Sequence, residues 1–354
     1  MSQSTTQITY KLWGEYAGQP VYLFRMENAG GAYVELTNYG ATLVSAVVAD
    51  AGGRLGNVVL GFQSLQAYLD DECYVGSTIG RYANRIGGAK FKLDDTIWFL
   101  ENNDGKNTNH GGKNGFNSKV FKYLISGDRL FFSILSEDGE GGYPGNLEFT
   151  VHYRWTDTNE LIINYHASTD KRTVTNFTNH AYFNLSDSGA KIFDHLLTVH
   201  ADNKLETDAE YIPTGNIKPL GNNRLIGTSV KNTMQIGDHR VIGLNDCYLL
   251  NKQNKQNQTL HEPAAELVEK KSGRKLEIFT TYPAIIVYTA DFLQSKHPGH
   301  HAHPYSAFDG LCLECQYYPD SPNHPNFPAT VLEAGDIYHQ TITYKFSTMA
   351  KAVK

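Results

Sequence analysis

The chain has 354 residues, of which 40% are hydrophobic and 19% are charged, a balance typical of an ordered globular protein. Its formal net charge is −6 and no block is rich in lysine or arginine, which argues against nucleic acid and anionic membrane as partners. Aromatic residues reach 12%, a proportion that favours β-structure and also suits surfaces that stack against sugar rings.

The N-terminal segment 1–7 is polar and lacks the apolar core of a secretory signal. No apolar run approaches the roughly 20 residues that a membrane-spanning helix needs. The four cysteines are sparse and irregularly spaced, which argues against a disulfide framework. We therefore expect a soluble, cytoplasmic protein.

Strand signals dominate the rest of the chain. Short β-branched and aromatic runs alternate with Gly and Asn turns about every ten residues, the spacing of a sandwich or barrel. The expected strands lie at 21–27, 32–36, 42–48, 58–61, 116–125, 130–135, 147–155, 160–167, 275–281, 285–288, 310–316 and 338–346.

Helical periodicity is sparse, with candidates at 64–69 and 263–270. No linker rich in Pro, Gly or Ser divides the chain, and the polar run 251–258 has the composition of an exposed loop tip. The pattern predicts one domain, 1–354, with an all-β fold: a large antiparallel β-sandwich with few short helices.

Two segments in the first third of the chain place polar side chains beside glycines. The stretch 80–91 contains Asn84 and Arg85, whose planar groups present several hydrogen-bond donors to a polyol. Arg81 lies so near that the pattern alone does not choose between the arginines. The stretch 102–112 ends with His110 and two glycines, which permit close backbone approach. An ordinary surface turn explains either segment equally well.

The stretch 173–185 is predicted to be an extended strand, in which alternate residues share a face. Its polar face consists of Asn176, Thr178, His180, Tyr182 and Asn184. The apolar residues Phe177, Ala181, Phe183 and Leu185 line much of the other face. His180 therefore lies among hydrogen-bonding side chains opposite a core-like face. A half-exposed strand with a solvated histidine is the alternative interpretation.

A tract with four histidines, 297–303, resembles a transition-metal tract. Its Pro and Gly residues favour a flexible loop that covers an active site or binds metal adventitiously.

Glu314 lies in the middle of an apolar, strand-like run. Burying an unpaired carboxylate costs several kcal/mol, so this residue is a functional candidate. Cys312, two residues earlier, shares its face. Cys312 and Cys315 are three residues apart in a strand and point to opposite faces, so they do not converge on a metal.

Taken together, these segments resemble the aldose 1-epimerase, or galactose mutarotase, family. The matching motifs follow the family's order and span most of the chain: 80–86, 103–105, 110–112, 138–147, 178–185, 245–246 and 312–314 with 319–320. The resemblance implies a large β-sandwich of mostly antiparallel strands with an open cleft for a monosaccharide. It also implies an isomerase that interconverts the α and β anomers of a hexose such as galactose or glucose, without metal or cofactor.

The resemblance further implies roles for seven residues. Glu314 is expected to be the general base, His180 the general acid and His110 an assisting group, with Arg85, Asp246, Asn84 and Tyr182 binding the sugar.

The expected chemistry opens the sugar ring, rotates the C1–C2 bond and closes the ring again, with His180 protonated and Glu314 ionised in the resting site. Two departures from the family pattern leave the preferred sugar open. Cys247 follows Asp246 where the family often has His, and Ile286 stands where some members carry Gln.

Three other functions remain as alternatives at this stage. A glycoside hydrolase needs a second carboxylate, for which Asp246 is a candidate. A non-catalytic sugar-binding protein has no use for a poised acid and base. A sugar-phosphate epimerase would want an arginine cluster, which the chain lacks. We expect a sugar as the partner molecule and a monomer or homodimer. Galactose, glucose, another aldose or a disaccharide all fit.

Overall fold

The computed structural model describes residues 6–237, 240–251 and 262–349. The predicted loop tip 251–258 lies outside these residues, except for Asn251.

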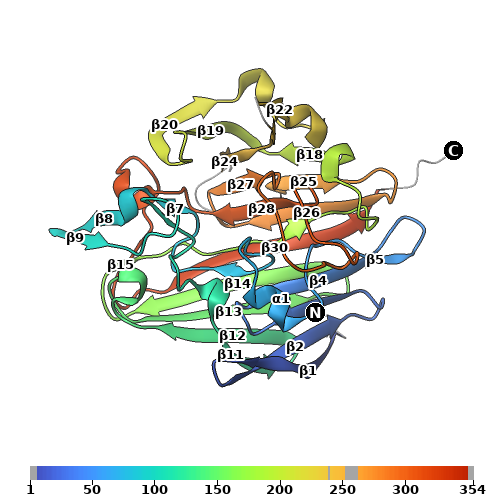
Figure 1. The fold of residues 1–354 in the computed structure, drawn as a ribbon, viewed down its shortest axis with the longest axis horizontal. Coiled ribbons are helices and arrows are strands. Elements are labelled where there is room, and N and C mark those ends of the chain that lie inside the picture. The colour runs from blue at the N-terminus through green and yellow to red at the C-terminus, as the bar shows by residue number, and fades with distance from the viewer. Residues whose placement is uncertain (1–5, 238–239, 252–261, 350–354) are drawn as a thin grey trace.

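Three antiparallel sheets form the body of the molecule (Figure 1). The first has five strands in chain order: β1 (Gln7–Tyr16), β2 (Gln19–Glu27), β3 (Tyr33–Thr37), β4 (Thr42–Ala49) and β5 (Leu55–Asn57). The second has nine strands in the order β11 (Lys122–Ser126), β12 (Arg129–Ser136), β13 (Leu147–Trp155), β14 (Glu160–Thr169), β30 (Tyr338–Thr348), β26 (Arg274–Thr280), β25 (Ala265–Val268), β18 (Leu196–Val199) and β21 (Thr228–Ser229). The third has six strands in the order β17 (Tyr182–Phe183), β28 (Leu311–Gln316), β27 (Ala284–Tyr288), β24 (Asn245–Leu250), β19 (Ala201–Thr207) and β20 (Pro213–Pro219).

Shorter elements connect these sheets. The two-stranded ladders pair β6 (Thr78–Ile79) with β16 (Thr178–Asn179), β7 (Arg85–Ile86) with β10 (Thr108–Asn109), β8 (Lys90–Leu93) with β9 (Thr96–Phe99), β15 (Thr173–Val174) with β29 (Val331–Leu332), and β22 (Gln235–Ile236) with β23 (Val241–Ile242). The described part of the chain has one α-helix, α1 (Leu65–Leu69). The short 3-10 turns are η1 (Gly87–Ala89), η2 (Phe116–Ser118), η3 (Glu140–Gly142), η4 (Ile192–Asp194), η5 (Gly221–Asn223), η6 (Val230–Thr233) and η7 (Ser321–Asn323).

The main core lies between the nine-stranded sheet and the other two sheets. In Figure 1 the nine-stranded sheet runs from β11 at the bottom to β18 near the top, with β1 and β2 beside its lower half and the six-stranded sheet beside its upper half. Strand β13 buries every second side chain, as a strand with one solvated face should. Trp155 at its end donates from its indole nitrogen to the Ala32 carbonyl, 3.0 Å away, and so ties two sheets together.

The all-β prediction is confirmed, and most expected strands are present within one or two residues of their predicted bounds. The helix expected at 64–69 is also present, and the Ser64 hydroxyl accepts a hydrogen bond from the Ala67 amide at its start. The helix expected at 263–270 is wrong. Ala265 and Leu267 alternate with more exposed residues, and this period of two places β25 between β18 and β26.

Two expected strands are shorter or absent. The segment 116–125 begins with the 3-10 turn η2, and its strand starts only at Lys122. The segment 58–61 forms no strand of its own, because Val59 makes a single isolated bridge to Phe183.

The prediction of one continuous strand over 173–185 is wrong. The segment contains three two-residue strands, β15, β16 and β17, which pair with β29, β6 and β28 respectively. Both of its supposed faces are buried. The polar side chains satisfy backbone groups instead of facing water: the Asn176 amide donates to the carbonyls of Ala83 and Tyr317. His180 lies in the break between β16 and β17.

None of the helices among the described residues has the length and apolar character needed to cross a bilayer.

Candidate active site

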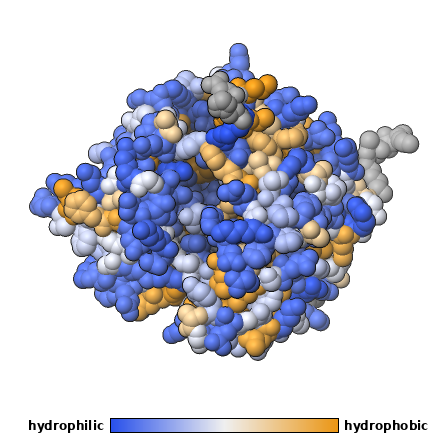
Figure 2. All heavy atoms as spheres, viewed as in Figure 1, coloured by the Kyte–Doolittle hydropathy of each residue, from blue (hydrophilic) through white to orange (hydrophobic). Residues whose placement is uncertain are grey.

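A cleft of about 790 Å³ opens beside the six-stranded sheet. Strands β28, β27 and β24 supply Glu314, Ile286, Tyr288 and Asn245 to its lining. Its other walls are formed by loops and short elements. They comprise residues 62, 67, 70–74, 84–85, 104–107, 109–110, 180, 182, 209–211, 292 and 294–296. Figure 2 shows a hollowed, mainly hydrophilic region on this face of the molecule. A polar cleft over a rigid sheet is suited to a small polar ligand.

Glu314 lies near the middle of β28, between β17 and β27, and the residue is 2% exposed. In the register of the sheet it stands opposite Ile286, an apolar neighbour. Burial raises the pKa of its carboxyl to about 8, although the positive charge of Arg85 opposes the shift. Its Oε2 atom has no hydrogen-bond partner among the described residues, so it is available to a ligand.

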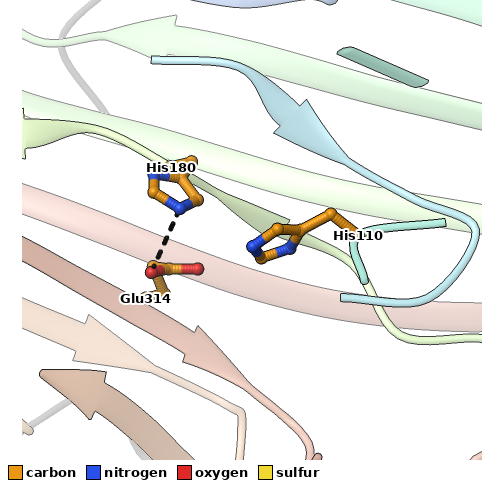
Figure 3. Close-up of side chains that lie close together, drawn as sticks. All are labelled: His110, His180 and Glu314. Carbon is orange, nitrogen blue, oxygen red and sulfur yellow. Dashed lines mark ion pairs between the residues drawn. The ribbon is translucent and has the colours of Figure 1, made fainter. Parts of the chain in front are cut away.

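His180 faces Glu314 from the break between β16 and β17 (Figure 3). Its backbone is held by hydrogen bonds with Ser77 and Gly76 of the neighbouring segment. The Nε2 atom of its ring lies 3.6 Å from Oε1 of Glu314, and Nδ1 contacts the Cys312 sulfur at 3.5 Å. Burial lowers the pKa of the imidazole to about 4.

These pKa shifts correct the expected charges of the pair. We expected a protonated His180 beside an ionised Glu314, whereas burial by the protein favours neutral forms of both groups. The number of protons is the same in either arrangement. Between about pH 4 and about pH 8 the pair holds one proton, and burial places it on the carboxyl.

His110 completes a cluster of three groups at the floor of the cleft. It follows β10 with a left-handed backbone (φ 52°), and its Nδ1 accepts a hydrogen bond from the Asn84 amide at 3.2 Å. This bond leaves Nε2 as the protonated nitrogen that can donate into the cleft. Burial, then the nearby His180 and Arg85, hold the pKa of His110 well below its usual value. Its ring lies edge-on to that of His180, with centroids 5.2 Å apart.

The same three side chains are the described residues that could hold a metal ion. One ligating atom each from His110, His180 and Glu314 lies within 4.8 Å of the others (Figure 3). Two imidazoles and a carboxylate are donors that zinc and other transition metals accept. The ring opening and closure that the sequence analysis expects of Glu314 and His180, however, need only the transfer of protons.

The structure brings Arg85, Asn84 and Tyr182 to the cleft with the catalytic candidates. Arg85 lies in β7, and its Nε donates to Asp104 at 2.7 Å. Asn84 is buried, and its side-chain oxygen accepts from the Arg85 amide. The Tyr182 hydroxyl donates to the Cys73 carbonyl, and its ring lies 5.1 Å from that of His180.

The geometry also decides between the two arginines. Arg81 is buried, and its guanidinium donates to the Ser136 hydroxyl and to the carbonyls of Pro144 and Gly145. Its role is therefore to hold the loops around β12 and β13 together.

Asp246 does not line the cleft. In β24 it pairs with Val287, a core residue, and its carboxylate contacts the Lys204 ammonium at 2.9 Å. The preceding residue, Asn245, stands opposite Tyr288, and both line the cleft. Adjacent strand residues point to opposite faces, so a difference of one position moves a side chain from one face to the other. The register of β24 against β27 is the signal that would have found Asn245.

Several other cleft residues were missed by sequence reasoning. Tyr74, Tyr211 and Phe292 are single aromatic residues in loops, and no pattern in the chain marks them.

The tract 297–303 does not itself line the cleft, whereas the residues just before it, 294–296, do. His297 pairs with Asp70 at 2.7 Å and His300 bonds to the Val44 carbonyl at 3.0 Å, so the tract is tied to the body.

Cys312 and Cys315 separate as expected. Cys315 packs in the main core, whereas Cys312 packs with Tyr182 in a second cluster and contacts His180.

An antiparallel β-sandwich whose polar cleft ends in a buried carboxylate–imidazole pair defines an enzyme that moves protons on a small polar molecule. The chain belongs to the aldose 1-epimerase family, whose model matches residues 22–345. It is 37% identical over 321 residues to a galactose mutarotase of Sus scrofa, covering 89% of this chain and 91% of that protein. It is 34% identical over 337 residues to an aldose 1-epimerase of Escherichia coli, covering 93% and 96%.

Solved structures agree with this assignment. A GalM/aldose epimerase homologue from C. elegans has a TM-score of 0.84 at 30% identity, covering 91% of this chain and 97% of that one. A galactose 1-epimerase from Lactobacillus acidophilus has a TM-score of 0.82 at 25% identity, covering 98% and 100%. The predicted family, fold and activity are thus confirmed: the protein is an isomerase with mutarotase function.

Proposed function

We propose that the protein interconverts the α and β anomers of a free hexose, such as galactose or glucose, and that Glu314 and His180 exchange the protons. One observation carries the proposal. A buried carboxylate and a buried imidazole lie 3.6 Å apart on the floor of a polar cleft. Their pKa values of about 8 and about 4 leave the pair with one proton near neutral pH. This arrangement suits a hemiacetal, whose hydroxyl and ring oxygen are bonded to the same carbon.

Ring opening uses the pair as base and acid. The carboxylate of Glu314 removes the proton of the C1 hydroxyl, and the imidazolium of His180 donates a proton to the ring oxygen. The bond between C1 and the ring oxygen breaks, and C1 becomes an aldehyde. Half a turn about C1–C2 presents the other face of the aldehyde, and the same proton transfers in reverse close the ring.

The protonation that burial favours matches the open-chain stage of this cycle. After ring opening Glu314 carries the proton and His180 is neutral, the forms that their shifted pKa values favour. A bound sugar shifts the balance towards the charged pair, because a hydroxyl that donates to Oε2 of Glu314 stabilises the carboxylate. His110 assists by donating from Nε2 to a sugar oxygen.

The remaining cleft residues orient the sugar in this proposal. Arg85, held by Asp104, presents donors to hydroxyl groups, and Asn84 supports it. Tyr182 contacts the sugar through its ring, because its hydroxyl already donates to Cys73. Asn245, rather than Asp246, contributes the polar group from β24.

The charges of the cleft argue against a sugar phosphate. Arg85 is the only arginine among the described cleft residues, and it already pairs with Asp104. The second carboxylate expected for a hydrolase, Asp246, pairs with Lys204 and is not among the residues that line the cleft.

Polarimetry of freshly dissolved α-galactose and α-glucose tests the proposal. The optical rotation should reach its equilibrium value faster with the protein than in buffer. A folded protein that leaves both rates unchanged would contradict the proposal. Release of free sugar from an aryl glycoside would instead support a hydrolase. A cytoplasmic location and a monomeric or homodimeric state remain predictions, the latter open to sedimentation analysis.

A further inference from the structure

We propose that Cys312 positions His180 for its reaction: the sulfur accepts a hydrogen bond from Nδ1–H of the imidazole, and so keeps Nε2 as the nitrogen that exchanges a proton with the sugar. The inference rests on the proposed function, in which His180 is the acid. It gives a role to a residue that contacts the imidazole but is not among the described residues that line the cleft.

Strand β28 contacts both nitrogens of the His180 ring. Side chains two residues apart in a strand point to the same face, so Cys312 and Glu314 project together toward the break between β16 and β17, where His180 lies. The Oε1 atom of Glu314 lies 3.6 Å from Nε2, and the sulfur of Cys312 lies 3.5 Å from Nδ1. One strand therefore holds the imidazole at each of its two nitrogens.

The two nitrogens have different surroundings. Glu314 lines the cleft, whereas Cys312 is fully buried. Cys312 stands opposite Tyr182 in β17 and Tyr288 in β27, and it packs with both in the second cluster. Nε2 is thus on the side of the reaction, and Nδ1 faces a fixed part of the protein interior.

The proton balance of the reaction decides which nitrogen keeps a proton. When the imidazolium gives its Nε2 proton to the ring oxygen of the sugar, the neutral imidazole that remains carries its one proton on Nδ1. Ring closure returns a proton to Nε2. Nδ1–H is therefore present throughout the cycle, and a buried donor of this kind needs an acceptor. The Cys312 sulfur is placed to accept it.

The opposite arrangement would interfere with the reaction. If the thiol donated its proton to Nδ1, the proton of the neutral imidazole would lie on Nε2. Such a ring has no free electron pair at Nε2, so it could not take the proton back there as the sugar ring closes. A hydrogen bond from Nδ1–H to the sulfur excludes this tautomer.

A thiol suits this position better than a carboxylate would. A neutral sulfur is a weak hydrogen-bond acceptor, and a thiol buried in apolar surroundings stays neutral. It therefore orients the ring without adding a negative charge that would hold the imidazolium proton. The carboxyl group of Glu314 lies at the other nitrogen, on the side where the proton moves.

His110 shows the contrasting arrangement on the same floor. Its Nδ1 accepts a hydrogen bond from the Asn84 amide, so its proton lies on Nε2. The ring centroids of His110 and His180 are 5.2 Å apart. The two imidazoles thus hold opposite tautomers: His110 is a constant donor to the sugar, and His180 exchanges protons through Nε2.

NMR of protein with ¹⁵N-labelled histidine tests the tautomer directly, because protonated and unprotonated ring nitrogens have well-separated chemical shifts. The chain has 14 histidines, so the signals of His180 are those that disappear in His180→Asn. Near pH 7, where the ring is neutral, we expect a protonated Nδ1 and an unprotonated Nε2. A wild-type ring with its proton on Nε2 would overturn the inference and leave the proposed function intact.

Kinetics of variants provide the second readout. Cys312→Ala should lower kcat for galactose by about 10- to 100-fold, the usual loss when a partner that orients a functional histidine is removed. KM should stay within about twofold, because Cys312 does not line the cleft. Cys312→Ser, whose hydroxyl can accept from Nδ1–H, should keep kcat within about fivefold of the wild type.

Cys315→Ala is the matched control. Cys315 is buried in the same strand, one residue beyond Glu314, but it points to the opposite face and packs in the main core. Its replacement should leave kcat and KM within about twofold of the wild type. Melting curves show first that each variant is folded.

Three kinetic results would overturn the inference: an unchanged kcat in Cys312→Ala, a rise in KM that matches the fall in kcat, or an equal loss in Cys315→Ala. If Cys312→Ala does not fold, the wild-type NMR spectrum and the serine variant decide. A folded wild-type protein that does not accelerate mutarotation would instead contradict the proposed function itself.

Discussion

At the scale of single residues, Glu314 combines a requirement of the chemistry with a cost to the fold. Its carboxyl is buried beside Ile286, and Oε2 has no partner among the described residues. Such a group destabilises the folded state when it is ionised. Active sites commonly keep groups of this kind because function requires them.

Glu314→Gln should abolish mutarotation and stabilise the protein above neutral pH. The pKa of Glu314 is about 8 when folded, above the usual 4.5, so the folded state retains a proton that the unfolded chain releases. Stability conferred by this group therefore falls as pH rises from 4.5 to 8, by up to several kcal/mol. A glutamine side chain does not titrate, so the variant should not lose this stability as pH rises. Above pH 6.5, the ordinary pKa of histidine, His180 becomes mostly neutral in the unfolded chain as well as in the folded protein, and the melting-temperature gain of the variant should increase up to about pH 8.

Thermal melts across that pH window measure the effect, and polarimetry measures the rate. Wild-type rates in Glu314→Gln would remove this residue from the mechanism.

His180→Asn should reduce kcat by about 10²–10⁴-fold, the usual contribution of one positioned acid or base. Asparagine keeps a polar side chain but cannot carry the proton. Polarimetry at saturating galactose gives kcat directly. A loss of only a few-fold would reduce His180 to a binding role.

The pH dependence of kcat/KM should be bell-shaped. Below about pH 4 both members of the pair are protonated and no base remains, and above about pH 8 neither carries the proton to be donated. Initial rates with dilute galactose from about pH 3 to about pH 9 would locate the two limbs. A rate that stays constant across this range would show that the pair does not limit catalysis.

At the scale of elements, the three groups of the floor come from distant parts of the chain. His110 follows β10, His180 lies between β16 and β17, and Glu314 is in β28 (Figure 3). The sheets therefore bring together residues that local sequence does not connect.

This cluster leads to a prediction about metals. Dialysis against EDTA should leave turnover unchanged, because proton transfer alone accounts for the reaction. Added Zn²⁺ should inhibit in competition with galactose, because the ligating atoms of the three side chains lie within 4.8 Å of one another. Loss of activity on EDTA treatment, restored by a metal, would contradict the expectation that the enzyme has no metal cofactor.

Local patterns predicted local features well. The alternation in β13 and the serine before α1 act within a few residues, so the sequence is sufficient to find them. The motifs also led to Glu314, His180, His110 and Arg85, all of which line one cleft. Glu314 stood out on physical grounds as well, since it interrupts an apolar strand.

Non-local pairing explains most of the errors. The segment 173–185 breaks into three strands because it meets three different partners, which no local pattern records. Asp246 was expected in the site from the family motif alone, and the register of β24 against β27, which places Asn245 at the cleft, is not recorded in that motif. The protonation states of Glu314 and His180 depend on burial by the whole fold, which favours the neutral form of both groups. The residue types alone led us to expect an ionised carboxylate and a protonated imidazole.

At the scale of the whole molecule, the main core joins strands from both ends of the chain. It includes Phe24 of β2, Tyr165 of β14 and Phe346 of β30. The nine-stranded sheet places β30 next to β14, so the C-terminal strand completes a sheet begun in the middle of the chain. Such sharing favours one folding unit, as the prediction of a single domain requires.

Calorimetry should therefore show one unfolding transition, with equal calorimetric and van't Hoff enthalpies. Two resolved transitions would divide the chain into separate units and contradict the single-domain prediction.

The single proton shared at the floor of the cleft has a consequence for turnover. Whatever Glu314 and His180 exchange with the sugar on opening they recover on closure, so each cycle ends with the enzyme in its starting form. No regenerating step is needed, and neither anomer has a privileged role as reactant. The protein hastens the approach to equilibrium from either side, and the relative free energies of the two anomers in solution set where that equilibrium lies.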